Sequence, residues 1–171
     1  LPLTGYVLAI GQQDNIAKNL PLSNKEKAYF CLGGQERVHS VLNALQYLLE
    51  IASEDDWVFV HDAARPCVSS SSLTQSLETA ILKNTSAILA IQVRDTLKYV
   101  ADHPKIEKTV SRDYLWQAQT PQIARLGMLK SAIEKALAHN IVITDEASAL
   151  EYAGHEVQVV QGRADNIKIT Y

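Results

Sequence analysis

The chain has 171 residues, of which 47% are hydrophobic and 20% charged, and its formal net charge is −3 at pH 7. This length predicts one domain whose core is large enough to be stable without disulfides. There is no basic tract for nucleic acid and no apolar run of the roughly 18 residues that span a membrane. Cys31 and Cys67 indicate neither a metal cluster nor a disulfide framework. We expect a cytoplasmic protein without a nucleic-acid or membrane partner.

Apolar runs that favour strands alternate with apolar residues at helical spacing. In the first half of the chain, we expect strands at Tyr6–Ile10 and Ala28–Leu32, a helix from Glu36 to Leu49, a strand at Val58–Val60, a helix that begins at Ser69–Ser72 and a strand at Ala87–Ile91. In the second half, we expect a helix at Ala124–His139, a helix that begins at Thr144–Glu146 and ends at Gly154, and strands at Val157–Val160 and Ile167–Thr170. This alternation predicts an α/β fold with a mostly parallel sheet. Ligands of such sheets bind beyond the carboxyl ends of the strands.

Residues 94–111 depart from the alternation. The segment TLKYVADHPKIEKTV has the pattern of two polar-faced strands joined by a turn at 102–105. An isolated hairpin is marginally stable in water unless it packs against something. We therefore expect an arm that docks on a neighbouring subunit.

Both ends of the chain fall on predicted strands, and its first residue is leucine. Natural domains seldom begin and end on core strands without flanking turns. We expect residues 1–171 to be a single, incomplete domain cut from a longer protein.

The segment HDAARP follows the predicted strand at Val58–Val60 and therefore lies at the expected ligand edge. One interpretation is a local pair of Asp62 and Arg65 that shapes a loop. The other is a carboxylate that binds Mg²⁺ and an arginine that binds a phosphate, with Ala63 leaving room for the ligand. We expect His61 to be a packed or hydrogen-bonded residue, not a general base.

Two other segments carry candidate anion-binding groups. Gly33 and Gly34 precede a predicted helix, whose N-terminal N–H groups can bind an anion, although such a pair is often only a turn. Lys168 alternates with two isoleucines on a predicted strand, either on a solvated face or buried against an anion. The sequence contains no G-x-S-x-G elbow, Walker loop or G-x-G-x-x-G motif.

The segments GGQERVHSV, VHDAARP, VRDTLK, QTPQ, TDEASALEYAG and GRADNIKIT together resemble the 2-C-methyl-D-erythritol 4-phosphate cytidylyltransferase family, in order and spacing. The resemblance implies a Rossmann-like sheet of the nucleotidyltransferase type. It also implies that CTP and the polyol phosphate condense with Mg²⁺, releasing pyrophosphate, in non-mevalonate isoprenoid synthesis. No covalent nucleophile is needed for that reaction.

The resemblance implies nucleotide and metal roles. Gly34, Gln35 and Ser40 fall at positions that contact the cytidine moiety, and Ala63 falls beside the nucleotide. Asp62 falls at the position that binds Mg²⁺.

The resemblance also implies a substrate pocket and a dimer. Positions that line the methylerythritol phosphate pocket are Arg65, Thr96, Arg112, Thr120 and Thr144. Arg112 and Lys168 would orient the attacking phosphate, with Lys168 also near the CTP phosphates. Residues 94–114 match the family's dimerisation arm, so a homodimer is expected to share its substrate contacts.

The sequence departs from the family pattern in places. Gln35 stands where the family often has aspartate, which alters a ribose or base contact. The glycine-rich PAAGxGxR unit and the helix expected beyond Tyr171 are not in the sequence, and we expect turnover below the family's rate. Two alternatives stay open: a ribitol 5-phosphate cytidylyltransferase, and a noncatalytic dimer that binds a nucleotide.

Overall fold

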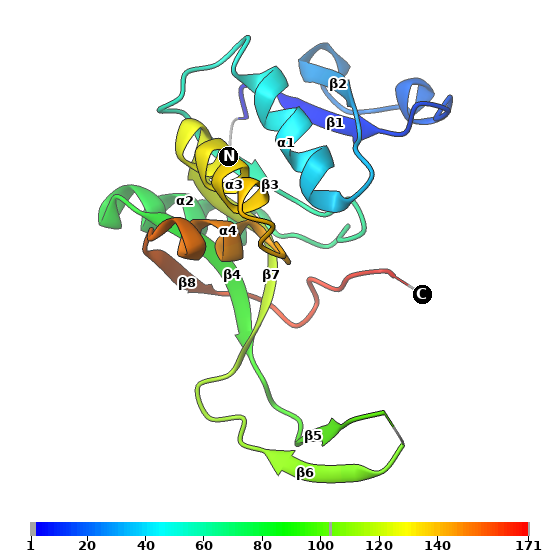
Figure 1. The fold of residues 1–171 in the computed structure, drawn as a ribbon. Coiled ribbons are helices and arrows are strands. Elements are labelled where there is room, and N and C mark those ends of the chain that lie inside the picture. The colour runs from blue at the N-terminus through cyan, green and yellow to red at the C-terminus, as the bar shows by residue number, and fades with distance from the viewer. Residues whose placement is uncertain (1–2, 103, 171) are drawn as a thin grey trace.

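A computed structural model describes residues 3–102 and 104–170, which form an α/β fold (Figure 1). The elements of these residues are β1 (Tyr6–Ile10), η1 (Ala17–Asn19), η2 (Lys25–Lys27), β2 (Ala28–Leu32), α1 (Arg37–Leu48), β3 (Trp57–Val60), α2 (Ser70–Lys83), β4 (Ser86–Gln92), β5 (Leu97–Val100), β6 (Ile106–Val110), β7 (Trp116–Arg125), α3 (Leu126–Ala138), α4 (Glu146–Ala153) and β8 (Val157–Gln161). None of these helices has the length and apolar character needed to cross a membrane.

The strands form two sheets and a separate hairpin. β1 pairs with β2 in parallel, while β3, β7, β4 and β8 form a four-stranded sheet in that order. β7 runs antiparallel to β3 and β4, and β8 runs parallel to β4, so three of these four strands share one direction. The expected α/β fold with mostly parallel strands is confirmed.

β7 was not predicted. The helix expected at Ala124–His139 begins only at Leu126, because Trp116–Arg125 continues the sheet. Gln119 and Gln122 are buried in β7, where their side-chain amides make hydrogen bonds. Buried amides weaken the apolar pattern by which a strand is recognised, which explains why this strand was missed.

The strand expected at Ile167–Thr170 is wrong, since this segment forms no strand in the described part of the chain. Both Ile167 and Ile169 are exposed. The Ile169 N–H donates a hydrogen bond to the Ala64 carbonyl (2.8 Å). The segment therefore lies along the loop that follows β3 and does not extend the sheet.

Helices cover both faces of the four-stranded sheet. Val58 and Val60 of β3 pack in a cluster with α1, α3 and α4. The alternating residues Trp57 and Phe59 pack on the opposite face, in a cluster that includes Leu77 of α2. Because α1 also packs against β1 and β2, it links the two-stranded sheet to this core.

The helix ends follow local capping rules. Ser69 caps α2, and its hydroxyl accepts a hydrogen bond from the Ser72 N–H (3.2 Å), as the serine run predicted. Asp145 caps α4 through a capping box with Ser148. Gly154 ends α4 with a φ of 91°, which glycine adopts without strain.

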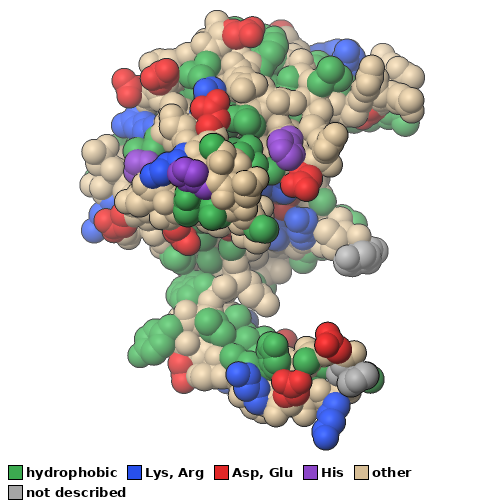
Figure 2. All heavy atoms as spheres, viewed as in Figure 1, with side chains coloured by type: hydrophobic (Ala, Val, Ile, Leu, Met, Phe, Trp, Pro, Cys, Tyr) green, Lys and Arg blue, Asp and Glu red, His purple; other side chains and the backbone are tan. Residues whose placement is uncertain are grey.

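The hairpin of β5 and β6 extends beyond β4 and β7, away from the helices (Figure 1). Two antiparallel strands were expected here, and they are confirmed, with residue 103 of the turn outside the described residues. Figure 2 shows hydrophobic side chains on this arm and on the neck that joins it to the body. The exposed apolar residues of this region include Tyr99, Val100, Ile106, Tyr114, Leu115 and Trp116.

Candidate active site

Asp62 lies just beyond β3 at the centre of a charged cluster. Its Oδ1 accepts a hydrogen bond from Arg37 Nε (3.0 Å), and its Oδ2 lies 3.0 Å from Lys168 Nζ and 3.7 Å from Arg65 Nε. Only 12% of the Asp62 side chain is exposed. Three cations thus converge on one largely buried carboxylate.

The Asp62 carboxyl is held in its ionised form. Burial favours the neutral acid, but hydrogen bonds and positive charge from Lys168 and Arg37 outweigh burial and lower the pKa below its usual value. An ionised carboxylate at neutral pH can bind a metal ion or hold a cation in place. Both uses suit a site for phosphates.

Arg37 begins α1 and Glu146 begins α4, and they form a bidentate ion pair beside Asp62. Arg37 Nη1 and Nη2 donate to Glu146 Oε1 (2.6 Å) and Oε2 (3.0 Å). Burial alone would lower the pKa of Arg37, but the hydrogen bonds and charges of Glu146 and Asp62 raise it above its usual value. The buried Glu146 lies in the first turn of α4, where the helix dipole favours a negative charge.

Thr120, buried in β7, fixes the backbone at Asp62. Its hydroxyl accepts a hydrogen bond from the Asp62 N–H (2.9 Å) and lies 3.0 Å from His61 Nδ1. His61 Nε2 lies 2.9 Å from the Arg65 carbonyl, which can only accept. In the neutral imidazole, Nε2 therefore donates and Nδ1 accepts from Thr120. The expectation that His61 is a hydrogen-bonded residue is confirmed.

The segment that carries Lys168 is tied to the same strand. Asn166 is buried, and its side-chain amide donates to the Thr120 carbonyl (2.9 Å). The Asn166 carbonyl accepts from Arg65 Nη1 (2.7 Å), and Gln119 donates to the Arg163 carbonyl (2.9 Å). These contacts explain why Lys168 reaches Asp62 without belonging to a strand.

The turn between β2 and α1 places the predicted nucleotide residues next to this cluster. The Gly34 N–H donates to Ser40 Oγ (2.9 Å). A Cβ atom at Gly34 would lie 2.2 Å from the Cβ of His39, so a larger residue does not fit. Gln35 is exposed just before Arg37. The contact of this turn with cytidine stays a prediction.

The other predicted site residues fall into two groups. Asp62, Arg65, Thr120 and Lys168 form one network, next to the exposed Ala63, and Thr144 lies just before the cap of α4. Thr96 and Arg112 instead lie on the arm, and the described contacts do not join them to Asp62. Within one chain, the arm residues are therefore separate from the charged cluster.

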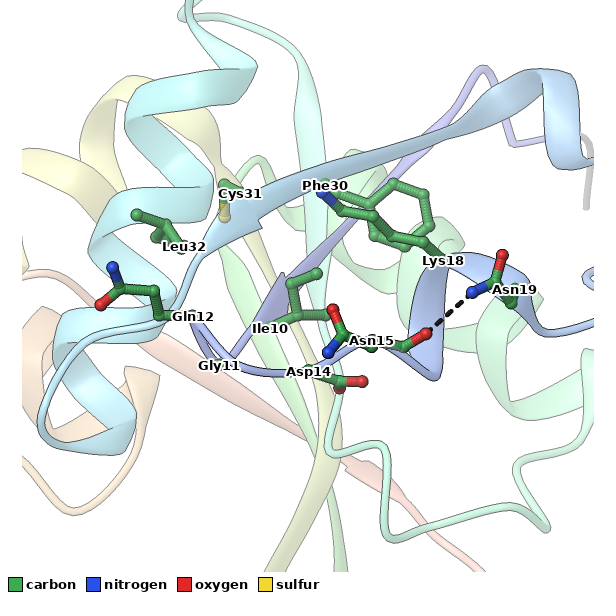
Figure 3. Close-up of a pocket in the computed structure, with 10 residues that line it drawn as sticks. All are labelled: Ile10, Gly11, Gln12, Asp14, Asn15, Lys18, Asn19, Phe30, Cys31 and Leu32. Carbon is green, nitrogen blue, oxygen red and sulfur yellow. Dashed lines mark hydrogen bonds between the residues drawn. The ribbon is translucent and has the colours of Figure 1, made fainter.

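Two cavities lie outside the cluster. One, of about 380 Å³, lies at the base of the arm and is lined by Gln92, Val93, Arg94, Arg112, Asp113, Tyr114 and Leu115. The other, of about 370 Å³, lies where β1 and β2 end (Figure 3). There the Asn19 amide donates to the Asn15 carbonyl (2.8 Å), beside Asp14 and Lys18. Asp62 lines neither cavity, so the site is identified by its charges, not by the hollows of the surface.

The described residues contain no group of three or more histidine, cysteine, aspartate or glutamate side chains that could hold a metal ion. A metal ion at Asp62 would therefore need ligands from water and substrate. Mg²⁺ is bound in this way when one or two carboxylates share it with phosphates. The donor set fits a metal ion that binds together with a nucleotide.

Arg37 and Glu146 belong to the site but were not predicted as members of it. Arg37 stands in the first turn of a helix, where the dipole disfavours a positive charge. A cation at that position indicates a nearby anion, although only the structure identifies which residue that anion is. Glu146 was recognised for its favourable place at the start of α4 but not as the partner of Arg37.

The chain is similar to known proteins over its whole length. The family model of IspD, 2-C-methyl-D-erythritol 4-phosphate cytidylyltransferase, matches residues 3–171. A curated enzyme of that name from Acinetobacter baumannii (strain SDF) is 68% identical over 171 residues, which are 100% of this chain and 72% of the relative.

Two solved structures are also similar to most of this chain. That of the Francisella tularensis enzyme is 41% identical, with a TM-score of 0.86 over 98% of this chain and 76% of that one. That of the Thermus thermophilus enzyme is 29% identical, with a TM-score of 0.81 over 98% of this chain and 76% of that one. The chain belongs to the 2-C-methyl-D-erythritol 4-phosphate cytidylyltransferase family.

Proposed function

We propose that this chain transfers a cytidylyl group from CTP to 2-C-methyl-D-erythritol 4-phosphate and releases pyrophosphate, in the non-mevalonate synthesis of isoprenoid precursors. The observation that carries the proposal is the convergence of Arg37, Arg65 and Lys168 on Asp62 in a member of this family. Both substrates are phosphate esters, and a positively charged cluster around one ionised carboxylate suits them. We place the reaction in the cytoplasm, where CTP is available.

The reaction exchanges one phosphorus–oxygen bond for another. A phosphate oxygen of the polyol substrate attacks the α-phosphorus of CTP, and the bond from that phosphorus to the oxygen of the pyrophosphate leaving group breaks. All the reacting groups are anionic, so the protein contributes mainly positioning and charge neutralisation. No residue of the chain needs to form a covalent intermediate.

Lys168 is the cation of the cluster best suited to contact phosphate. Its side chain is 40% exposed, and its partner in the absence of substrate is Asp62 Oδ2. An incoming phosphate can replace Asp62 as the partner of the Lys168 ammonium group, while Arg65 remains near the Asp62 carboxylate. Our proposal is that Lys168 contacts the CTP phosphates and helps to orient the attacking phosphate.

Asp62 is the residue that we propose as the protein ligand of Mg²⁺. Its pKa is lowered, so the carboxylate is available at neutral pH. When bound, Mg²⁺ would neutralise charge on the phosphates of CTP. Asp62 also holds Lys168 and Arg65 beside the place where these phosphates bind.

The polyol phosphate site is proposed to be shared between two protomers. Arg65, Thr120 and Thr144 belong to the body of one protomer. The partner subunit's Thr96 and the partner subunit's Arg112 would complete the pocket, since the arm projects away from its own body (Figure 1). Gly34, Gln35 and Ser40, with Ala63, are proposed to contact the cytidine part of CTP.

A pyrophosphate-release assay tests the proposed function. With CTP and Mg²⁺ present, 2-C-methyl-D-erythritol 4-phosphate should support release, while ribitol 5-phosphate at equal concentration should support far less. Asp62→Asn should abolish most of the release. Tight binding of CTP without turnover of either polyol phosphate would refute the proposal and favour a binding module.

A further inference from the structure

Arg37 connects Asp62 to a second carboxylate that lies deeper in the fold. Its Nε donates to Asp62, while Nη1 and Nη2 both donate to Glu146. Glu146 is only 3% exposed, so its charge is shielded from water. We propose that Glu146 is a positioning residue that acts through Arg37 to fix the carboxylate of Asp62; the inference rests on the proposed function.

The strand β7 holds both the start of α4, which carries Glu146, and the backbone of Asp62. Gln122 of β7 donates to Asp145 Oδ2 (2.9 Å) and accepts from the Ala147 N–H (2.9 Å), which attaches the start of α4 to this strand. Thr120, on the same strand, accepts from the Asp62 N–H. The backbone of Asp62 and the anchor of its side chain are thus both fixed to β7.

The Arg37 guanidinium group can pass the orientation set by Glu146 on to Asp62, because its donors form a rigid planar fork. A bidentate pair with Glu146 sets the plane of the fork, and that plane aims Nε at Asp62 Oδ1. The opposite oxygen, Oδ2, then faces Lys168 and Arg65. Without Glu146, Arg37 is free to follow an incoming phosphate, and Asp62 Oδ1 loses the contact that fixes its direction.

The charge of the cluster separates a geometric effect of Glu146 from an electrostatic one. Arg37, Arg65 and Lys168 carry three positive charges, and Asp62 and Glu146 carry two negative charges, which leaves a net charge of about +1. Loss of the charge on Glu146 raises this to about +2. A more positive cluster does not by itself weaken phosphate binding, so weaker binding or slower transfer in its absence points to geometry.

The test is a double-mutant cycle on Glu146 and Asp62. In the otherwise native protein, Glu146→Gln is expected to lower kcat/KM roughly 10- to 100-fold, as losing the partner of a ligand usually does. The loss should include a higher KM for CTP, because Asp62 is the proposed protein ligand of the Mg²⁺ that binds with CTP. In an Asp62→Asn background, Glu146→Gln should cause little further loss. Glu134→Gln removes a carboxylate that pairs with Lys130 on the surface of α3 and should change nothing.

Binding supplies a readout that does not depend on turnover. Calorimetric titration of CTP in the presence of Mg²⁺ is repeated for the same four proteins of the cycle, with circular dichroism to measure their folded fractions. The inference requires weaker binding in Glu146→Gln and no further weakening when Asp62→Asn is already present. Equal losses in both backgrounds mean that Glu146 is merely structural and overturn the inference.

The inference and the proposed function can fail separately. If the native protein binds CTP but transfers its cytidylyl group to neither polyol phosphate, the proposed function fails and the binding cycle alone decides the inference. If Glu146→Gln does not fold, Arg37→Lys takes its place, since lysine keeps the charge but lacks the planar fork that contacts Asp62 and both oxygens of Glu146. Normal transfer and normal CTP binding in folded Arg37→Lys would also overturn the inference.

Discussion

The Nζ atom of Lys168 lies 3.0 Å from Oδ2 of Asp62, although Asp62 follows β3 and Lys168 belongs to the C-terminal segment. The contact joins two segments that are far apart in the sequence, HDAARP and GRADNIKIT. It places an exposed ammonium group beside a largely buried carboxylate. Such a pair can separate when a phosphate binds the ammonium group, as the proposed cytidylyl transfer requires.

Lys168→Ala should lower kcat/KM strongly and leave the fold intact. The substitution removes a proposed contact to phosphates and little core volume, since the side chain is 40% exposed. Loss of one preorganised charge contact typically costs about 10²- to 10³-fold in rate. Steady-state pyrophosphate release measures the loss, and circular dichroism measures the fold.

Lys130→Ala is the matched control for this prediction. Lys130 pairs with Glu134 one turn away on α3 and lies outside the charged cluster. Its removal should leave kcat/KM unchanged. If Lys168→Ala unfolds the protein but the folded fraction keeps normal specific activity, Lys168 is structural and the proposed role is wrong.

The lowered pKa of Asp62 predicts an acid-dependent stability. A carboxyl whose folded pKa lies below its unfolded pKa stabilises the fold above the unfolded value, which is about 3.9 for aspartate. That contribution is lost as the pH falls through the lower, folded pKa. The free energy of unfolding, measured by urea at several pH values, should therefore fall less steeply on acidification in Asp62→Asn than in the native protein.

Asp165 provides the comparison for this pH experiment. Its pKa is also lowered, chiefly by a hydrogen bond from Arg163, but both side chains of the pair are more than half exposed. Solvent screens exposed pairs, so Asp165→Asn should hardly change the pH dependence of stability. An Asp62→Asn curve that is parallel to the native curve across the acid range would contradict the assigned pKa direction.

Local rules predicted much of the fold. Ser69 and Gly154 were recognised because caps depend on one residue and its immediate neighbours. The strands β1 and β2 were recognised because their apolar runs are short and continuous. β7 was not, because Gln119 and Gln122 satisfy their amides with partners that are distant in sequence.

The site was predictable only in part, for a similar reason. Lys168 was expected either on a solvated face or beside an anion, and its partner is the Asp62 carboxylate, although the expected strand around it is absent from the described chain. Arg37 and Glu146 were not assigned to the site, because α1 and α4 meet through tertiary packing that no local pattern encodes. Motifs thus identified single residues, while the folded chain supplied their pairing.

Thr120→Val should destabilise the protein, whereas Thr120→Ser should not. Valine has nearly the shape of threonine but cannot accept from the Asp62 N–H or donate to His61. A buried donor left unsatisfied costs about 1–3 kcal/mol. Urea unfolding measures the difference, and serine keeps the hydroxyl. Equal stability of the two variants would show that the hydroxyl contributes nothing to the loop that carries Asp62.

The exposed apolar side chains of the arm predict a homodimer, which a single charged substitution on the arm should dissociate. Ile106 is 56% exposed on the hairpin, where apolar surface needs a partner to be covered. Light scattering after size exclusion should give a dimeric mass for the native protein and a monomeric mass for Ile106→Asp. The unfolding temperature of the body should change little, since Ile106 belongs to neither buried cluster of the core. Leu82→Asp is the control and should remain dimeric, because Leu82 is 83% exposed on α2. This helix belongs to the body and lies away from the arm (Figure 1). A native protein that is monomeric at micromolar concentration, or an Ile106→Asp variant that stays dimeric, would contradict the proposed role of the arm.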